Sequence, residues 1–184
     1  MQKSTQIHWP APGRSTLTSR LNFAEANAAN PSTACLFTLV SIPKAEKVAL
    51  MLASLEAGRP TADGVDPHYA GYFAYFNRGQ FYEAHDVLEH LWLPQRGGKN
   101  DSFYKGLIQL AGAFVHLQKN RLGPAAALFK LARTNLQKYP AIHEHLDLAK
   151  VMSSINRWLE MLAETNTNPL TPESQPSLVL IPRS

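Results

Sequence analysis

The chain has 184 residues, 45% of them hydrophobic, and a formal net charge of +4, values that suit one globular domain. Its basic residues form no cluster longer than pairs such as Lys119 and Arg121, so we do not expect it to bind nucleic acid. No apolar run approaches the ~20 residues that cross a bilayer, and the lone Cys35 excludes an internal disulfide framework. These features predict a soluble protein of a reducing compartment, with no membrane partner.

Residues 1–40 are rich in Asn, Ser, Thr, Ala and Pro and show little hydrophobic period, which predicts an irregular N-terminal arm. The first 24 residues contain Lys3, Arg14 and Arg20 but no acidic residue, a composition that is also typical of an organelle transit segment. The simpler interpretation is a loose arm on a cytoplasmic protein. An organellar protein with a cleaved N-terminal segment is the alternative.

Six segments with helical periodicity follow, over residues 41–163. Proline near the start of a segment and glycine or asparagine after its end set most of the expected boundaries. In chain order, the expected helices are residues 43–57, 67 to the turn at 77–79, 81–93, 101 to the turn at 120–124, from that turn to about 139, and 140–163. Residues 164–184 are expected to form an extended C-terminal tail, in which Leu178–Ile181 packs back on the domain.

Apolar residues at the 3.6-residue period define the expected buried faces of the later helices. The fourth helix, with Asp101 as its cap, has the strongest pattern, and the fifth has three leucines. The buried residues expected in the fourth helix are Phe103, Leu107, Leu110, Phe114 and Leu117, and those in the fifth are Leu128, Leu131 and Leu136. In the sixth helix, which is expected to start at Pro140, they are Ile142, Leu146, Ala149, Met152, Ile155 or Asn156, and Leu159.

Two similar turns connect these helices: Asn77-Arg78-Gly79 recurs as Asn120-Arg121-x-Gly123. We interpret Asn77 and Asn120 as cap or turn residues, because asparagine tolerates left-handed dihedral angles. Turns this short make neighbouring helices pack antiparallel. The sequence therefore predicts an all-α fold, a single compact bundle of five to six helices built from antiparallel helical hairpins.

The third helix is unusually dense in groups that bind protons or metals. On a helical wheel its core arc consists of Phe81, Ala84, Leu88, Leu91 and Trp92. His85 and Glu89 lie at the edge of that arc, whereas Glu83, Asp86 and His90 point nearer to solvent. Because His85 and Glu89 are four residues apart, their side chains can meet, partly shielded from water. This arrangement is typical of a proton-transfer pair or of two ligands of one metal.

The fourth helix could supply a third ligand. Gln109 and His116 are seven residues apart and point in nearly the same direction, with the small residues Gly112 and Ala113 between them. If this stripe faces the third helix, then His116 can join His85 and Glu89. Two imidazoles and one carboxylate with open positions suit zinc, iron or manganese.

A structural interpretation stands beside this one. A histidine and a glutamate at a helix margin more often form a buried hydrogen-bond network, and a lone histidine such as His116 is more often a helix-end residue. Trp92 is expected to be a core residue. The pattern also differs from the zinc-peptidase motif, which needs a second histidine where Glu89 stands.

Three stretches in this order resemble the DUF 309 family, a helical domain of unknown function: Phe76–Trp92, Lys105–Ala111 and His116–Asn120. The resemblance covers roughly residues 67–138 and implies a compact helical bundle. Some family members are labelled predicted metal-dependent hydrolases, which points to His85, Asp86, Glu89 and Trp92 on one helix and to Gln109 and His116 on the next. The family pattern usually has glutamate at position 86, so the shorter Asp86 argues against a direct ligand there.

Two functions follow as expectations. In the first, a metal-dependent hydrolase-like site, His85 and His116 bind one divalent ion, Glu89 binds it or acts as general base, and Asp86 orients a histidine. In the second, the chain is a non-enzymatic helical-hairpin module that binds a partner protein or a second copy of itself, and the same side chains only fix the register of the helices.

Overall fold

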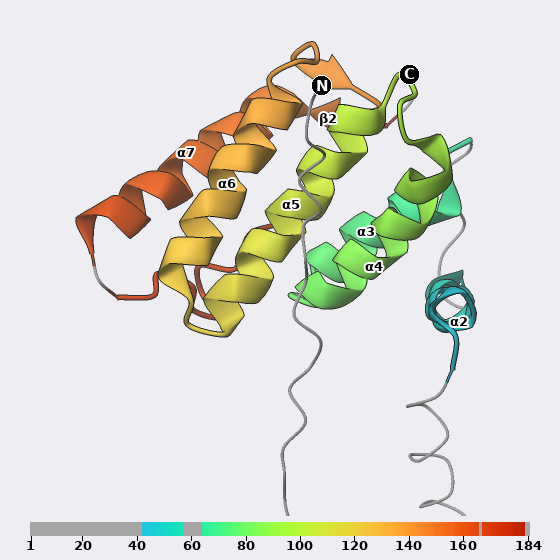
Figure 1. Ribbon diagram of the computed structural model, residues 1–184, viewed down its shortest axis with the longest axis horizontal. Coiled ribbons are helices and arrows are strands. Elements are labelled where there is room, and N and C mark those ends of the chain that lie inside the picture. Colours follow the sequence, from blue (N-terminus) through green and yellow to red (C-terminus); the bar gives the residue numbers. More distant parts are fainter. Residues whose placement is uncertain (1–41, 57–63, 166, 183–184) are drawn as a thin grey trace, which may run out of the picture. The chain divides into compact units, whose positions relative to one another are not determined.

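The computed structural model describes residues 42–56, 64–165 and 167–182, all of them in one unit that spans Ser41–Ser184. The arm expected over residues 1–40 lies outside the described residues. Six α-helices dominate the described part (Figure 1), as the sequence predicted. In chain order the elements are α2 (Lys44–Glu56), α3 (Pro67–Phe76), α4 (Phe81–Trp92), the 3-10 turn η1 (Leu93–Gln95), α5 (Asp101–Gln118), α6 (Leu122–Leu136), β1 (Ile142–His143), β2 (Leu146–Asp147) and α7 (Leu148–Glu164).

Helix α5 is the centre of the bundle and lies between α4 and α6 (Figure 1). The face predicted for it is buried throughout, with Phe103, Leu107 and Leu117 at 0% exposure. The Phe114 ring lies 4.9 Å from the Phe81 ring and about as close to three further aromatic rings. Aromatic clusters of this kind bury large apolar areas, so α5 joins the α3–α4 pair to α6 and α7.

Both predicted turns connect antiparallel helices. Gly79 and Asn120 have φ values of +72° and +54°, the left-handed conformation that these residue types adopt most easily. Asn77, by contrast, is right-handed and ends α3. The Gln118 side chain donates a hydrogen bond of 2.8 Å to the Gly79 carbonyl, which ties the end of α5 to the turn before α4.

Helices α5 and α6 approach closely at a glycine. A Cβ added at Gly106 would lie 2.7 Å from Leu136 Cγ, so glycine is what allows this contact. The buried side chains of α6 are Ala125, Phe129, Ala132 and Leu136. Of the predicted leucines, Leu131 is 46% exposed, a wrong prediction, because the large Phe129 ring rather than Leu131 faces α5.

Asp101 is the first residue of α5 rather than its cap, which is Asn100. The Asp101 carboxylate instead accepts a hydrogen bond of 2.6 Å from the Trp92 indole. This bond satisfies the polar atom of a buried ring and fixes the end of α4 to the start of α5.

The prediction that the last helix begins at Pro140 is wrong. Residues 142–147 form a two-stranded antiparallel hairpin, and its turn residues Glu144 and His145 both have positive φ. Helix α7 begins only at Leu148, where the Asp147 side chain caps it by accepting a bond from the Lys150 amide. Its buried residues are Leu148, Val151, Ile155 and Trp158, whereas Ile142 in the hairpin is 63% exposed.

The C-terminal tail returns to the bundle at two places. The Asn77 side chain donates to the Leu178 carbonyl and accepts from the Leu178 amide, both at 2.8 Å. Two residues later, Leu180 pairs with Leu146 in an antiparallel bridge, and the Ile181 amide donates to the His145 carbonyl. The tail thus connects the end of α3 with the hairpin.

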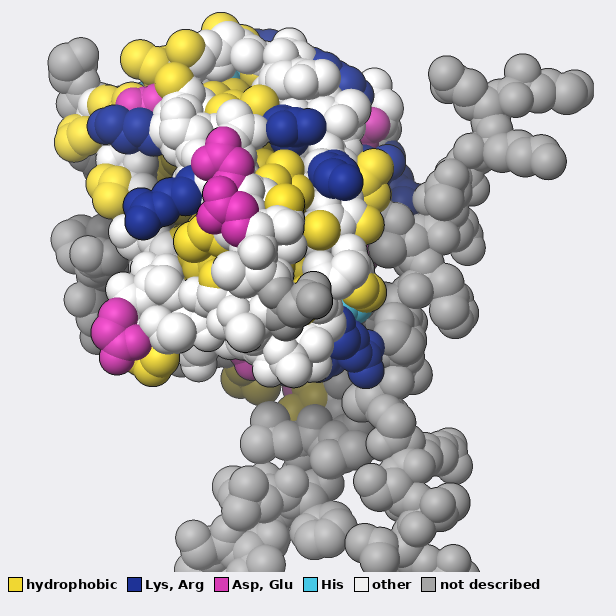
Figure 2. All heavy atoms as spheres, turned by 90° about the vertical axis from the view of Figure 1, so that its left-hand side faces the viewer, with side chains coloured by type: hydrophobic (Ala, Val, Ile, Leu, Met, Phe, Trp, Pro, Cys, Tyr) yellow, Lys and Arg dark blue, Asp and Glu magenta, His cyan; other side chains and the backbone are white. Residues whose placement is uncertain are grey.

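Surface charge is mixed on the face that Figure 2 shows, where lysine and arginine side chains alternate with acidic and hydrophobic ones. Among the described helices, none is long and apolar enough to span a membrane.

Candidate metal site on helix α4

Helix α4 presents three potential ligands at its margin: His85, Asp86 and Glu89, here called the α4 cluster. The opposite side of the helix is buried, as the wheel predicted, and Val87 is buried too. His85 and Glu89 are half-buried, in agreement with their expected place at the edge of the core. Glu83 is also half-buried and His90 is exposed.

Asp86 differs from its prediction. The wheel placed it near solvent, yet the residue is only 4% exposed. The cause is α2, which packs against α3 and α4 and covers this side of α4. A carboxylate loses its hydration on burial, which is costly unless charged or hydrogen-bonding partners replace the water, so the partners of Asp86 decide the chemistry of the site.

Those partners are two lysines one turn apart on α2 and the neighbouring histidine. Lys44 Nζ lies 2.9 Å from Asp86 Oδ1 and also pairs with Glu89 Oε2. Lys47 Nζ lies 3.8 Å from Asp86 Oδ2. His85 Nδ1 lies 3.4 Å from Asp86 Oδ1. Each oxygen of the buried carboxylate therefore faces a cation, and one of them also faces an imidazole.

These contacts keep Asp86 charged. Burial by itself would raise the pKa of the Asp86 carboxyl, but the hydrogen bonds from His85 and Lys44 lower it below its ordinary value. Burial likewise opposes the charge of Lys44, yet its bonds to Asp86 and Glu89 raise the pKa of its ammonium group. The site is thus an ionised group of opposite charges at a helix interface.

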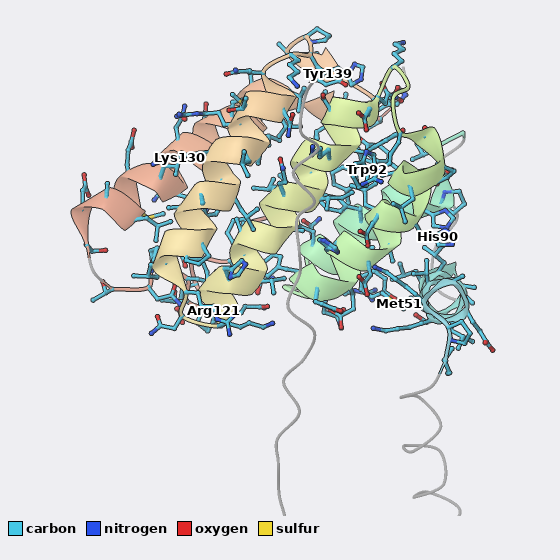
Figure 3. The ribbon with its side chains drawn as sticks, in the orientation of Figure 1. Met51, His90, Trp92, Arg121, Lys130 and Tyr139 are labelled. Atoms are coloured by element: carbon cyan, nitrogen blue, oxygen red, sulfur yellow. The ribbon has the colours of Figure 1, made fainter. Side chains whose placement is uncertain are left out.

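Helix α2 is held on α3 and α4 by other contacts as well. Val48 is 1% exposed, and the Tyr75 hydroxyl donates a bond of 2.8 Å to the Met51 carbonyl. A Cβ on Gly71 would lie 2.7 Å from Leu52 Cδ2, so the glycine lets α2 approach α3 closely. Figure 3 shows Met51 on α2 at the place where this helix meets the α3–α4 pair.

The α4 cluster fits a metal ion in its composition and spacing. One ligand atom from each of His85, Asp86 and Glu89 lies within 4.8 Å of the other two. Ligands that bind zinc at 2.0–2.2 Å are roughly 3–4 Å apart, so small side-chain shifts would bring these atoms together. The group could therefore hold a metal ion, and the short side chain of Asp86 does not keep it out of the group.

His116 is not part of this group, which among the described residues is the one set of three or more such ligands. It lies at the α5–α6 turn, where its carbonyl accepts a bond from the Arg121 amide. Burial, with Arg121 and Lys119 nearby, lowers the pKa of its imidazole. Figure 3 shows Arg121 at this end of the bundle.

Gln109 shows which way the predicted stripe on α5 faces. Gln109 is 3% exposed, and its side-chain carbonyl accepts a hydrogen bond of 2.8 Å from the Asn135 side chain on α6. The stripe that contains Gln109 thus faces α6 and not α4, and the small residues Gly112 and Ala113 are themselves buried.

The other predicted site residues have structural roles. Trp92 is buried, bonded to Asp101, and covered by the Arg96 guanidinium at 4.4 Å from its ring centre. Asn77 holds the C-terminal tail at Leu178, and Asn120 forms the left-handed turn before α6.

A second polar group, not predicted from the sequence, lies at the β1–β2 end of the bundle: Asn100, His143 and Glu144, here called the hairpin cluster. The Asn100 amide donates to Glu144 Oε1 at 2.7 Å, and its carbonyl oxygen lies 3.0 Å from His143 Nε2. Because the Asn100 oxygen can only accept, His143 donates from Nε2. The Tyr139 ring lies 4.6 Å from the His143 ring and helps to cover it.

Sequence reasoning missed Lys44 and Lys47. A signal was available: Lys44 precedes the buried Val48 by four residues and Lys47 directly precedes it, so both lie near the face that α2 buries. What the sequence could not supply was the partner of that face.

Comparison with curated proteins gave no match to the chain. The match to a family is confined to the helical core, and it confirms the predicted resemblance over a somewhat shorter stretch than the expected 67–138. It takes in most of α3, all of α4 and α5, and the first half of α6, about a third of the chain. Residues 69–128 match the model of the family described as "Domain of unknown function (DUF309)".

Proposed function

We propose that the α4 cluster binds one divalent metal ion, such as zinc, iron or manganese, and that the protein is hydrolase-like at this site. The observation that carries the proposal is the close approach of the three ligand atoms, within 4.8 Å of one another. The buried and ionised Asp86 adds to it, because a carboxylate held in its charged form at 4% exposure is ready to bind a cation.

The donor set suits this group of metals. Imidazole favours zinc and iron, and carboxylates favour manganese and magnesium. Three protein ligands leave coordination positions open, as in catalytic rather than structural zinc sites. A metal bound there would polarise a substrate oxygen or lower the pKa of a bound water.

The protein's own side chains would divide the remaining work. Glu89 has a side chain that is 25% exposed, which makes it the carboxylate in the cluster better placed to accept a proton from solvent or to bind the metal. Asp86, besides offering an oxygen to the metal, contacts the His85 imidazole and so can orient that ring.

A second candidate function has an observation of its own. Lys44 pairs with both carboxylates of the α4 cluster, so the cluster also works as an ionic clamp that fixes α2 to α4. In that case the chain is a non-enzymatic helical module that binds a partner protein, and it needs no metal.

Metal content separates the two functions. The full chain, purified without a histidine tag, is freed of metal by a chelator and titrated with Zn²⁺ or Mn²⁺ in a calorimeter. We expect binding of one ion, weakened by at least about tenfold in His85→Ala. The matched control is His90→Ala, which removes an exposed histidine of the same helix that stacks on His68 at 5.0 Å and should bind metal as the parent does.

Hydrolysis supplies the second part of the test. The metal-loaded protein is assayed on activated carboxyl and phosphate esters, with Glu89→Gln as the variant and Glu83→Gln as its control on the same helix. The proposal expects turnover that needs metal and is lost only in the Glu89 variant. A folded parent protein that binds neither ion would overturn it in favour of the interaction module.

A further inference from the structure

Lys44 already pairs with both carboxylates of the α4 cluster, the groups whose negative charge a bound metal would need. Its ammonium group contacts one oxygen of Asp86 and one oxygen of Glu89. These are the two carboxylates among the three possible ligands. The ammonium therefore neutralises the same negative charge as the ion proposed above.

A metal and this ammonium cannot share those oxygens at full strength. A divalent ion binds carboxylate oxygens at about 2.0–2.2 Å, which would leave the ammonium a few ångströms from it in a partly dehydrated site. Like charges that close disfavour each other, so the ammonium weakens the binding of the ion.

The position of Lys44 in α2 lets it withdraw at little cost. It is the first residue of the helix, and its side chain is 48% exposed. The ammonium can therefore turn into solvent while the rest of the helix keeps its conformation. The apolar contacts of α2 lie farther along, at Val48 and at Leu52 against Gly71. Helix α2 can thus stay docked when Lys44 leaves.

From these contacts we infer that Lys44 is a built-in competitor of the metal: it fills the α4 cluster in the metal-free protein, and metal binding expels it. The inference rests on the proposed function and adds a regulation to it. The affinity of the site is set by α2, a helix outside the matched family segment. Any change that removes the charge of Lys44, including acetylation, would raise the affinity for metal.

The first test compares metal affinities. The metal-free full chain is titrated with Zn²⁺ and Mn²⁺ as the parent, as Lys44→Met, and as Lys130→Met, a control that removes one positive charge from exposed Lys130 on α6 (Figure 3). Removing the competitor should raise the affinity about tenfold, within the usual range of coupling between sites. The control should match the parent.

The second test needs no variant. Acetylation of each lysine by a water-soluble reagent is followed by mass spectrometry in the parent protein, with and without saturating metal. Expulsion of Lys44 should increase its rate of acetylation several-fold, while the rate at Lys130 stays constant.

The outcomes distinguish the two proposals. If all three proteins bind metal with equal affinity and Lys44 keeps its acetylation rate, the competitor role is wrong and the metal site stands. If none of them binds metal, the proposed function is itself overturned, and the inference with it.

Discussion

The α4 cluster and the hairpin cluster are both half-buried groups of a histidine with acidic or amide side chains, yet they are built on different principles. In the hairpin cluster a neutral amide, Asn100, joins His143 to Glu144 through two directed hydrogen bonds. In the α4 cluster two carboxylates meet cations across a helix interface, and the closest partner is a half-exposed lysine.

The difference separates a structural network from a candidate binding site. Directed bonds through a neutral amide fix one geometry and leave little to exchange. Charges that are balanced by an ammonium group can be balanced by another cation, because the Coulomb attraction depends on charge and distance rather than on the kind of ion. Among the described residues, the α4 cluster is the one group of three or more ligands that could hold a metal ion.

The largest effect, a loss of folding stability, is expected at the hairpin cluster from Asn100→Ala. This substitution removes the side chain that bonds to both His143 and Glu144. Because the His143 donor and the Glu144 acceptor both lose their bond to Asn100, the free energy of unfolding should fall by about 1–2 kcal/mol. Urea denaturation measures this loss. The control Asn156→Ala removes an exposed asparagine bonded to Arg133 and should change stability by less than about 0.5 kcal/mol. Equal losses in the two variants would mean that the hairpin cluster is not a stabilising network.

A smaller effect is expected from salt, and only at the α4 cluster. At 1 M salt the screening length falls to about 3 Å, from about 10 Å at 0.1 M. The Lys44 end of these ion pairs is half-exposed, so salt reaches it. A loss of up to about 1 kcal/mol would make hydrogen exchange in residues 44–50 about two- to fivefold faster. Exchange in residues 141–148 should stay within experimental error, since the hairpin cluster is joined by a neutral amide. The same acceleration in both segments would mean that the hairpin cluster depends on ion pairs as much as the α4 cluster does.

The smallest effect concerns pH at His143. Burial lowers the pKa of its imidazole, with Lys99 acting in the same direction and Glu144 against it. The folded state then binds protons less readily than the unfolded state, so this contribution to stability is complete above the unfolded pKa of about 6.5 and is lost as the pH falls through the folded pKa.

The measurement is the free energy of unfolding at about pH 8 and about pH 5, in the parent and in His143→Gln, whose amide can still donate to Asn100. The parent should lose more stability on acidification than the variant does. A variant that loses as much as the parent would show that His143 does not carry this pH dependence.

The sequence predicted the helices well because helices are determined locally. The period of Phe103, Leu107 and Leu117, and the left-handed turns at Gly79 and Asn120, depend only on neighbours in the chain. The β1–β2 hairpin escaped prediction for the opposite reason. Glu144 is not a typical left-handed residue, and the carbonyls of Glu144 and His145 are held by the distant Tyr69 hydroxyl and Ile181 amide.

The same limit applies to the candidate site. The wheel for α4 placed His85 and Glu89 correctly at the edge of the core, because that edge depends on the helix itself. It misplaced Asp86 because the burial of Asp86 depends on α2, whose Lys44 is 45 residues from Glu89 in sequence. The hydrophobic period of α4 alone does not show which other helix packs against it.

The two hydrogen bonds between Asn77 and Leu178 join residues that are 101 positions apart in the sequence. They offer a place to attach a reporter group. Ser177, the exposed neighbour of Leu178, could be replaced by cysteine and labelled with a dye. The tail at this point is bonded to the end of α3. The brightness or anisotropy of the dye would therefore report a local opening of the α3–α4 hairpin, although the label is attached to the C-terminal segment.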